Sequence, residues 1–223
     1  MIIGLVGFIG AGKGTVGDLL RLQGYKQMSF AGVLKDTASI MFGWDRDLLE
    51  GDTVESRVFR ETKDDFWSDK FGYDFTPRLA LQRLGTEAGR DVFHKDIWVY
   101  ALEKRIKQHR NVVITDTRFP NEIDWIRKQG GVIVEVKRGE RPEWYTSALL
   151  ENTDEQIGYM DTYWPDIHYS EWAWIGQKID YTITNDGTLQ DLSGVVKDLL
   201  TQLENRVTIE KLYDEEGVTN EVV

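Results

Sequence analysis

The string GFIGAGKGT, residues 7–15, brings together residue types that can hold the phosphates of a nucleotide. Within its G-x-x-x-x-G-K spacing, the glycines Gly7, Gly10 and Gly12 let the backbone turn and point its N–H groups inward. Lys13 can then reach the β- and γ-phosphates. An apolar run precedes the string and a helical pattern follows it, as a phosphate loop requires. We predict nucleotide phosphate binding here; the alternative is a tight turn with a surface lysine.

The residue after this lysine narrows the class of enzyme. Gly14 stands where phosphate loops usually have Ser or Thr, whose hydroxyl binds Mg²⁺, and the first hydroxyl here is that of Thr15. The string G-A-G-K-G-T resembles the loop of adenylate kinase and related nucleoside monophosphate kinases. That resemblance implies a metal held largely through water and a distant acid. It favours a small-molecule kinase over a GTPase, and the chain has no N-K-x-D string to bind guanine.

An acid at the end of a second apolar run, VVITD at 112–116, is the candidate metal ligand. If 111–116 is a buried strand, Asp116 lies at its carboxyl end and faces the phosphate loop. Carboxylate oxygens are among the ligands that Mg²⁺ prefers. We predict a Mg²⁺ site at Thr15 and Asp116, with direct or water-mediated binding. The alternative is a strand-ending acid that caps a turn.

A polar stripe follows Thr76 and Pro77, which are typical of a helix start. Residues spaced by four form this slowly winding stripe: Arg78, Gln82, Thr86 and Arg90. Two glycines, Gly85 and Gly89, lie beside it. Each costs about 0.5–1 kcal/mol relative to alanine within a helix, so we expect something to pack closely there. The stripe suits a phosphate and a base edge; the alternatives are an exposed face or a helix broken at Gly85.

The elements that must position these residues alternate between strands and helices. Short apolar runs predict strands at 2–6, 25–31, 111–116, 132–136 and 180–187. Helical spacing predicts helices at 12–22, 31–42, from 77, 96–108, 120–130 and 188–203. Residues 44–75 have weak periodicity and 138–178 are irregular and aromatic. This order predicts an α/β fold, a three-layer P-loop NTPase sandwich whose central parallel sheet has about five strands.

Length and composition limit the domain organisation, the location and the partners that can be expected. The chain has 223 residues, 41% of them apolar, no cysteine and a net charge of −11. We expect a single domain with an acceptor-binding insertion at about 44–95, a lid-like segment at about 138–178 and an acidic tail at 206–223. Neither a membrane span nor a signal peptide is expected, and the lack of cysteine fits a cytoplasmic location. The acidic balance disfavours nucleic-acid binding, whereas local groups of arginine suit small anionic ligands.

Longer strings carry a more specific resemblance. TPRLALQRLGTEAGRDVF, then DIWV, TDTRFPNE, DIHYSEWAW and NDGTLQDL together resemble the deoxynucleoside monophosphate kinases of bacteriophages, from residue 2 to about 200. The resemblance implies phosphorylation of deoxynucleoside 5′-monophosphates to diphosphates for DNA precursor synthesis, with ATP as donor and Mg²⁺ as cofactor. It implies small-molecule partners, and a homodimer is a further expectation. A phage-encoded enzyme of this kind would act in the host cytoplasm.

The same resemblance assigns roles to residues. Lys13, Asp116, Arg118 and Arg138 are the expected catalytic residues, with Arg118 touching the transferred phosphoryl group and Arg138 in a mobile lid. The expected ATP-binding residues are Gly10, Ala11, Gly12, Lys13, Gly14, Thr15, Asn185 and Gly187. The expected acceptor-binding residues are Phe30, Lys35, Arg78, Gln82, Thr86, Glu87, Arg90, Trp98 and Glu171. A base could stack on Phe30, Trp98 or Trp172.

Two other functions stay open at this point. One is a different small-molecule kinase, such as a dephospho-coenzyme A kinase, which has a similar closing N-x-G turn. The other is a nucleotide-gated binding module that hydrolyses ATP slowly and phosphorylates nothing.

Overall fold

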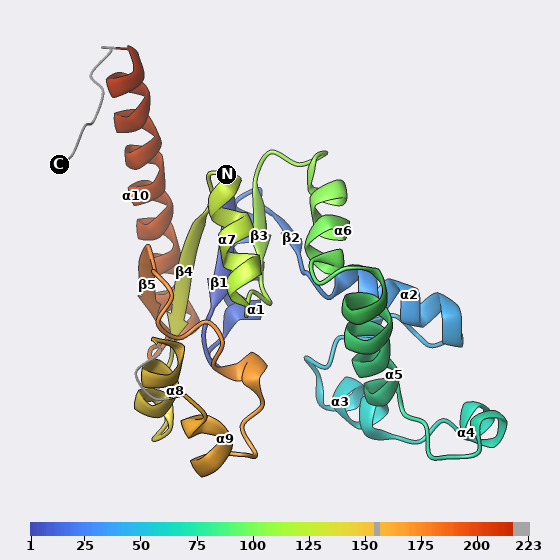
Figure 1. The fold of residues 1–223 in the computed structure, drawn as a ribbon. Coiled ribbons are helices and arrows are strands. Elements are labelled where there is room, and N and C mark those ends of the chain that lie inside the picture. Colours follow the sequence, from blue (N-terminus) through green and yellow to red (C-terminus); the bar gives the residue numbers. More distant parts are fainter. Residues whose placement is uncertain (154–156, 216–223) are drawn as a thin grey trace.

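The computed structural model describes residues 1–153 and 157–215, with side chains as far as Arg206. Its centre is a five-stranded sheet in the order β2-β3-β1-β4-β5 (Figure 1). The strands are β1 (Ile2–Val6), β2 (Lys26–Met28), β3 (Val112–Ile114), β4 (Val132–Lys137) and β5 (Tyr181–Thr184). All four strand pairs are parallel. The predicted parallel sheet is confirmed, and the strand that carries the phosphate loop is its central one.

Helices cover both faces of the sheet, so the three-layer prediction is also confirmed (Figure 1). On one face, α1 (Lys13–Leu22) and α10 (Leu189–Glu215) bury Val16, Leu20 and Leu192 against β1 and β4. On the other, α6 (Ile97–Ile106), α7 (Pro120–Lys128) and α8 (Tyr145–Asn152) form a second core. These continuous apolar strands bury side chains on both faces, which is why their sequences do not alternate.

A helical unit lies beside the edge strand β2 (Figure 1). It comprises α2 (Gly32–Phe42), η1 (Asp47–Leu49), α3 (Val54–Glu61), α4 (Asp65–Phe71), α5 (Pro77–Arg83) and the π-helix η2 (Leu84–Phe93). Its own core contains Ala38, Trp44 and Phe75. Because α2 contributes to that core, packing extends the unit back from residue 44 to residue 32.

Local signals explain the helices that periodicity did not reveal. Thr53 and Ser56 form a reciprocal capping box at the start of α3. Asp64 accepts a hydrogen bond from the Trp67 backbone N–H and caps α4. The predicted start of the next helix is confirmed, since the Thr76 hydroxyl accepts from the Leu79 N–H. Helices of seven or eight residues, as α3 and α4 are, are too short to show a clear apolar period.

The two C-terminal segments differ from expectation. Residues 138–178 contain α8, α9 (Tyr159–Tyr163) and the short helix η3 (Tyr169–Glu171), rather than irregular chain alone. The last helix continues to Glu215 instead of ending near residue 203, because no glycine or proline occurs between residues 203 and 215. Residues 216–223 of the expected acidic tail lie outside the described residues. In the described part of the chain, no helix combines the length and the apolar character that a membrane span needs.

Candidate active site

Four loops meet at one edge of the sheet, because the carboxyl ends of parallel strands all point the same way. They follow β1, β3, β4 and β5. Hydrogen bonds tie three of them together: Asn185 Nδ2 donates to the Ala11 carbonyl at 2.9 Å, and the Gly139 N–H donates to Asp186 Oδ1 at 2.6 Å. The predicted phosphate loop and the predicted Asn-Asp-Gly turn are therefore in direct contact.

The glycines of the phosphate loop serve two purposes. A Cβ on Gly7 would lie 2.4 Å from the Val136 carbonyl oxygen, and one on Gly12 would lie 2.3 Å from Asn185 Nδ2. Both also have positive φ, which favours glycine. By contrast, a Cβ on Gly10 or Gly14 would meet no atom within 4 Å. Gly7 thus allows strand β4 to approach and Gly12 allows the loop after β5 to approach, while Gly10 and Gly14 border open space where phosphate groups could lie.

Lys13 begins α1 and folds back over this loop. Its Nζ donates hydrogen bonds to the Gly7 carbonyl at 2.7 Å and the Phe8 carbonyl at 2.9 Å. Burial, with a smaller contribution from the positive charge of Arg118, lowers the pKa of the Lys13 ammonium to about 8. A phosphate bound beside Lys13 would favour the charged form of the ammonium, so the two groups would stabilise each other.

The Asp116 side chain links the end of β3 to the residues that follow β2. Its Oδ1 accepts from the Phe30 N–H at 2.9 Å, and its Oδ2 accepts from the Ala31 N–H at 3.0 Å. These N–H groups lie just before α2, so the carboxylate caps the turn that leads into the helical unit. This is the capping contact that the sequence left open as an alternative to metal binding. Each oxygen keeps a further lone pair, so the geometry still allows water-mediated contact with a cation.

Arg118 is held in place by a residue to which the sequence analysis gave no role. Oε2 of Glu122 accepts the backbone N–H of Arg118 at 2.8 Å and that of Phe119 at 3.1 Å. Glu122 is only 3% exposed. Burial and the nearby Asp116 carboxylate raise its pKa to about 7. It is the third residue of α7, the position from which an acid completes a capping box, and that pattern in TDTRFPNE could have revealed it.

The side chain of Arg118 points to the segment after β4. Its Nη1 donates to Glu171 Oε1 at 2.5 Å and to Ser170 Oγ at 3.2 Å. The charges of Arg118, Glu171 and Asp116 all act on Lys13. The structure thus brings together four predicted residues from three separate segments of the chain.

The second half of the polar stripe lies on an unusual helix. The turns of η2 are wider than those of an α-helix because its hydrogen bonds span five residues instead of four. Each residue of η2 therefore rotates by less than the 100° of an α-helix, and residues spaced by four lie nearly above one another. Arg78 and Gln82 lie on α5 and keep the α-helical rotation, whereas Thr86 and Arg90 lie on η2, where the predicted winding stripe becomes nearly straight. Gln82 and Thr86 of this stripe are exposed.

The two glycines beside the stripe explain how η2 packs. A Cβ on Gly89 would lie 2.7 Å from Trp98 Cζ2, and Trp98 Nε1 donates to the Gly85 carbonyl at 2.8 Å. The close packing expected from these glycines is therefore against an indole ring. This contact uses the Trp98 side chain to hold η2 on α6.

The arginines at the two ends of the stripe contact different parts of the molecule. Arg78 pairs with Glu61 at the end of α3. Arg90 lies over the Phe119 ring at 4.7 Å, and its Nη2 is 3.8 Å from Glu122 Oε1. Because Glu122 also holds the Arg118 backbone, a single buried carboxylate links η2 to the loop after β3.

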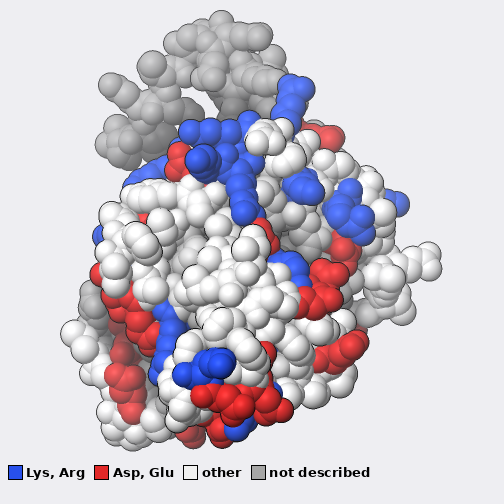
Figure 2. Space-filling view, turned by 90° about the vertical axis from the view of Figure 1, so that its right-hand side faces the viewer, with Lys and Arg blue, Asp and Glu red and all other residues white. Residues whose placement is uncertain are grey.

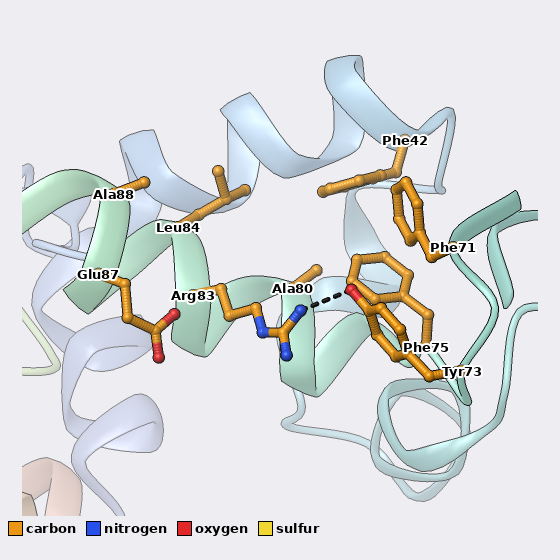
Figure 3. Close-up of a pocket in the computed structure, with 9 residues that line it drawn as sticks. All are labelled: Phe42, Phe71, Tyr73, Phe75, Ala80, Arg83, Leu84, Glu87 and Ala88. Carbon is orange, nitrogen blue, oxygen red and sulfur yellow. Dashed lines mark hydrogen bonds between the residues drawn. The ribbon is translucent and has the colours of Figure 1, made fainter.

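Glu87 lies away from this stripe. It lines a hollow of about 340 Å³ with the rings of Phe42, Phe71, Tyr73 and Phe75 (Figure 3). Arg83 reaches across this hollow, where its Nη1 donates to the Tyr73 hydroxyl at 2.5 Å. The structure therefore places Glu87 beside Arg83 at this hollow; its predicted acceptor-binding role rests on the family resemblance and not on the spacing of four.

Other predicted residues are buried, paired or exposed. Phe30 is 2% exposed and packs edge-on against Trp125, and Trp172 is 6% exposed, so neither offers a free face to a base. Lys35 is ion-paired with Glu50 at 2.5 Å. Arg138 is exposed at the end of β4, beside the phosphate loop. Gly187 and Thr15 are also exposed.

The surface of the helical unit carries charges of both signs. Figure 2 views the molecule from the side on which the helical unit lies, and shows Lys and Arg gathered in the upper part of the view, with Asp and Glu beside and below them. Basic groups are thus concentrated locally on a chain whose net charge is −11. In the part of the chain that the structure describes, no group of three or more His, Cys, Asp or Glu residues could hold a metal ion by itself.

Solved structures of several small-molecule kinases share this arrangement only broadly. A shikimate kinase from Aquifex aeolicus is 17% identical, with a TM-score of 0.42, and the match covers 93% of this chain and 99% of that one. A dephospho-CoA kinase from Campylobacter jejuni is 12% identical, with a TM-score of 0.45, and the match covers 90% and 96%.

Sequence relatives are more specific. A protein of Acanthamoeba polyphaga mimivirus, provisionally named a deoxynucleotide monophosphate kinase, is 33% identical over 152 residues, 62% of this chain and 74% of the relative. The deoxynucleoside-5′-monophosphate kinase of Escherichia phage T5 is 42% identical over 74 residues, 32% of this chain and 28% of that protein. Residues 48–196 match the model of the deoxynucleotide monophosphate kinase family. With two thirds of its length matched, and with a phosphate loop facing an arginine-bearing helical unit, this chain belongs to the deoxynucleotide monophosphate kinase family.

Proposed function

We propose that this enzyme transfers the γ-phosphoryl group of ATP to the 5′-phosphate of a deoxynucleoside monophosphate, forming the diphosphate and ADP. The observation that carries the proposal is the convergence of Lys13, Arg118 and Glu171 at the sheet edge, in a chain of this family. Lys13 lies on the phosphate loop, and Arg118 lies between that loop and the helical unit. A donor and an acceptor phosphate bound on either side of Arg118 would both be near its charge.

The donor would bind across the loops that follow β1, β4 and β5. The backbone from Gly10 to Thr15 would hold the phosphates, with Lys13 on the β- and γ-phosphates. Asn185 and Gly187 would border the adenine, and this assignment is supported by the 2.9 Å bond from Asn185 to the phosphate loop. Arg138 would reach the phosphates from the end of β4.

The acceptor would lie against the helical unit. Arg78 and Arg90 bound the polar stripe, and Gln82 and Thr86 between them offer hydrogen bonds to a base edge or sugar. We leave Phe30, Trp98 and Trp172 out of the acceptor site, since their rings are used in packing.

The phosphoryl transfer requires mainly that the two substrates are positioned correctly and that the developing negative charge is stabilised. An oxygen of the acceptor phosphate, already an anion near neutral pH, attacks the γ-phosphorus while the bond to the β–γ bridging oxygen breaks. Lys13 and Arg118 would stabilise the charge that develops on the transferred group and on the leaving ADP. No general base is required. The segment with Glu171 would help to exclude water, which favours transfer over hydrolysis.

Magnesium fits the donor groups of this site. Mg²⁺ usually keeps several waters and takes one or two carboxylates together with substrate phosphates, so a cage made only of protein groups is not needed. Asp116 and Thr15 would approach the ion, the acid through water because its oxygens already accept backbone N–H groups. The ion would neutralise phosphate charge.

The cellular location and the oligomeric state of the enzyme are two further parts of the proposal. Because the donor is ATP, we place the enzyme in the cytoplasm, that of the host if the chain is phage-encoded. We also propose a homodimer, which sedimentation at several protein concentrations would test. The dephospho-coenzyme A kinase and binding-module alternatives have no observation that favours them over the family assignment.

A coupled assay of ADP release tests the proposed function. The four common deoxynucleoside monophosphates, their ribose counterparts and dephospho-coenzyme A are each supplied with ATP and Mg²⁺. We expect at least one deoxynucleotide to accelerate ADP release well above the rate with ATP alone. Acceleration by dephospho-coenzyme A only, or by no acceptor, would contradict the proposal.

A further inference from the structure

Arg60 is a cation to which neither the motifs nor the proposed mechanism gives a role. It lies in the last turn of α3 and is half-buried. Its Nε is fully buried and has no hydrogen-bond partner among the residues that the structure describes. Within the same residues, its hydrogen bonding is limited to a contact from Nη1 to the Glu50 carbonyl at 3.5 Å, the limit of such a bond. A buried guanidinium with so little compensation is unfavourable unless an anion joins it.

The local backbone is shaped around this side chain. A Cβ on Gly51 would lie 2.1 Å from Arg60 Nη1 and 3.2 Å from its Cζ, so only glycine leaves room for the guanidinium. Gly51 also has a φ of 76°, which favours glycine. The side chain is therefore held at a defined place, with Nε enclosed by the protein and Nη2 left to donate to an anion.

Neighbouring cations each have a carboxylate, and Arg60 does not. Arg78 pairs with Glu61, Lys35 with Glu50, and Arg118 with Glu171. Among the residues that the structure describes, no Asp or Glu oxygen lies within 4.0 Å of the Arg60 nitrogens. Arg60 is thus the cation of this group without a directly paired carboxylate among the described residues, although Glu61 and Glu50 favour its charge from a greater distance.

Arg60 belongs to the same electrostatic neighbourhood as the reacting centre. Burial, followed by the positive charge of Arg78 and, more weakly, that of Arg118, lowers the pKa of its guanidinium. It remains charged at neutral pH, as arginine does in proteins. Arg118 in turn acts on Lys13. Cations therefore extend from the phosphate loop through Arg118 to α3, which lies on the side of the helical unit nearest the sheet (Figure 1).

We propose that Arg60 binds the phosphate of the acceptor nucleotide through Nη2 of its guanidinium. The proposal rests on the proposed function, because it needs a deoxynucleoside monophosphate as the second substrate. The acceptor is favoured over ATP since Arg60 lies in the helical unit, with Arg118 between it and the phosphate loop. Arg60, Arg78 and Arg118 then surround one phosphate, and Arg90 is left for the base or the loop after β3.

Steady-state kinetics with each substrate varied in turn test this assignment. Arg60→Ala should raise the acceptor KM by about tenfold or more and leave the ATP KM within about twofold. Arg60→Lys should restore part of the loss, because it keeps the charge but not the guanidinium. Arg57→Ala is the matched control: Arg57 lies on the same helix, is exposed and bonds only to the backbone carbonyls of Asp52 and Thr53.

The outcomes separate this proposal from the function on which it rests. If the parent enzyme uses a deoxynucleotide and Arg60→Ala keeps the parent's acceptor KM, the Arg60 assignment is wrong and the kinase function stands. An increase confined to the ATP KM also overturns it. A parent enzyme that uses no deoxynucleotide would contradict both.

Thermal unfolding gives a second readout that a purely structural arginine would not share. Arg60→Met replaces a half-buried charge with an apolar chain of similar length, so the ligand-free variant should unfold at a higher temperature than the parent. It should also lose most of the stabilisation that the four deoxynucleoside monophosphates, each added without ATP, give to the parent. A lower unfolding temperature with undiminished stabilisation by these nucleotides would show that Arg60 only supports the fold.

Discussion

At the scale of single residues, two ionisable groups have pKa values moved toward neutrality by the same cause. Burial lowers the pKa of Lys13 to about 8 and raises that of Glu122 to about 7. One group lies on the phosphate loop and the other supports the loop that carries Arg118. Perturbed values of this kind gather at functional sites, and each makes a prediction about pH.

The charge of Lys13 should limit the capture of ATP at high pH. Because the free enzyme's lysine loses its proton near pH 8, kcat/KM for ATP should fall as pH rises above about 8. Lys13→Arg, which stays protonated, should remove that fall even if its overall rate is lower. Lys13→Ala should lower kcat by at least about 10²-fold at every pH. A parent profile that stays flat to pH 10 would mean that Lys13 does not control ATP capture.

Glu122 should make folding stability depend on pH. Its folded pKa lies above the unfolded value of 4.5, so the folded state binds the proton more tightly and stability is lost as pH rises from about 4.5 to 7. A shift of this size corresponds to about 3 kcal/mol. Glu122→Gln should flatten the free energy of unfolding over that range, measured by urea denaturation.

The control for this measurement is Asp124→Asn on the exposed side of the same helix. It should leave the parent's pH dependence in place. If Glu122→Gln and Asp124→Asn both keep the parent's pH dependence of the free energy of unfolding, Glu122 is ionised throughout the range. Other groups would then offset the effect of its burial.

At the scale of elements, η2 shows where sequence reasoning succeeds and where it fails. Residues spaced by four were recognised as a set, and the glycines beside them predicted a close contact. The wide turns of the π-helix were not predicted, because periodicity arguments assume the rotation of an α-helix. Glu87, which only the family resemblance assigned to the acceptor site, lines the aromatic hollow together with Arg83.

The fit of η2 against α6 should be sensitive to one methyl group. Gly89→Ala would place a Cβ 2.7 Å from both the Leu84 carbonyl oxygen and Trp98 Cζ2, so we expect a loss of about 1–3 kcal/mol in stability. The acceptor KM should rise because Arg90 follows directly. Gly194→Ala in α10 is the control: its Cβ would meet nothing within 4 Å, so it should stabilise by about 0.4–1 kcal/mol. Equal effects of both variants on unfolding would contradict the packing role of Gly89.

The helices of the two inserted segments were largely invisible to sequence reasoning. α3, α4 and α9 have eight, seven and five residues, which is too few for a period to emerge. Their positions depend on capping contacts and on aromatic packing such as that of Phe42, Trp44 and Trp67. The sheet and its covering helices were predictable because long apolar runs and helix signals repeat along the chain.

At the scale of the whole molecule, we assign ATP binding to the sheet edge and acceptor binding to the helical unit. Strand order places the phosphate loop at the centre, with the loops after β3 and β4 on either side of it. The sequence identified Lys13, Asp116 and Arg118 because motifs surround them. It missed Glu122, although the capping-box pattern could have revealed it, and it missed Arg60, because a buried guanidinium nitrogen without a partner becomes visible only in three dimensions.

The most direct test of the account follows the phosphoryl group itself. ATP labelled at the γ-phosphate is incubated with the enzyme, Mg²⁺ and each of the four common deoxynucleoside monophosphates, and the products are separated, with Lys13→Ala in parallel. We expect the label to appear in a deoxynucleoside diphosphate, one for each ADP formed, and to vanish with Lys13→Ala. Label found only in inorganic phosphate, with every deoxynucleotide unchanged, would contradict the account.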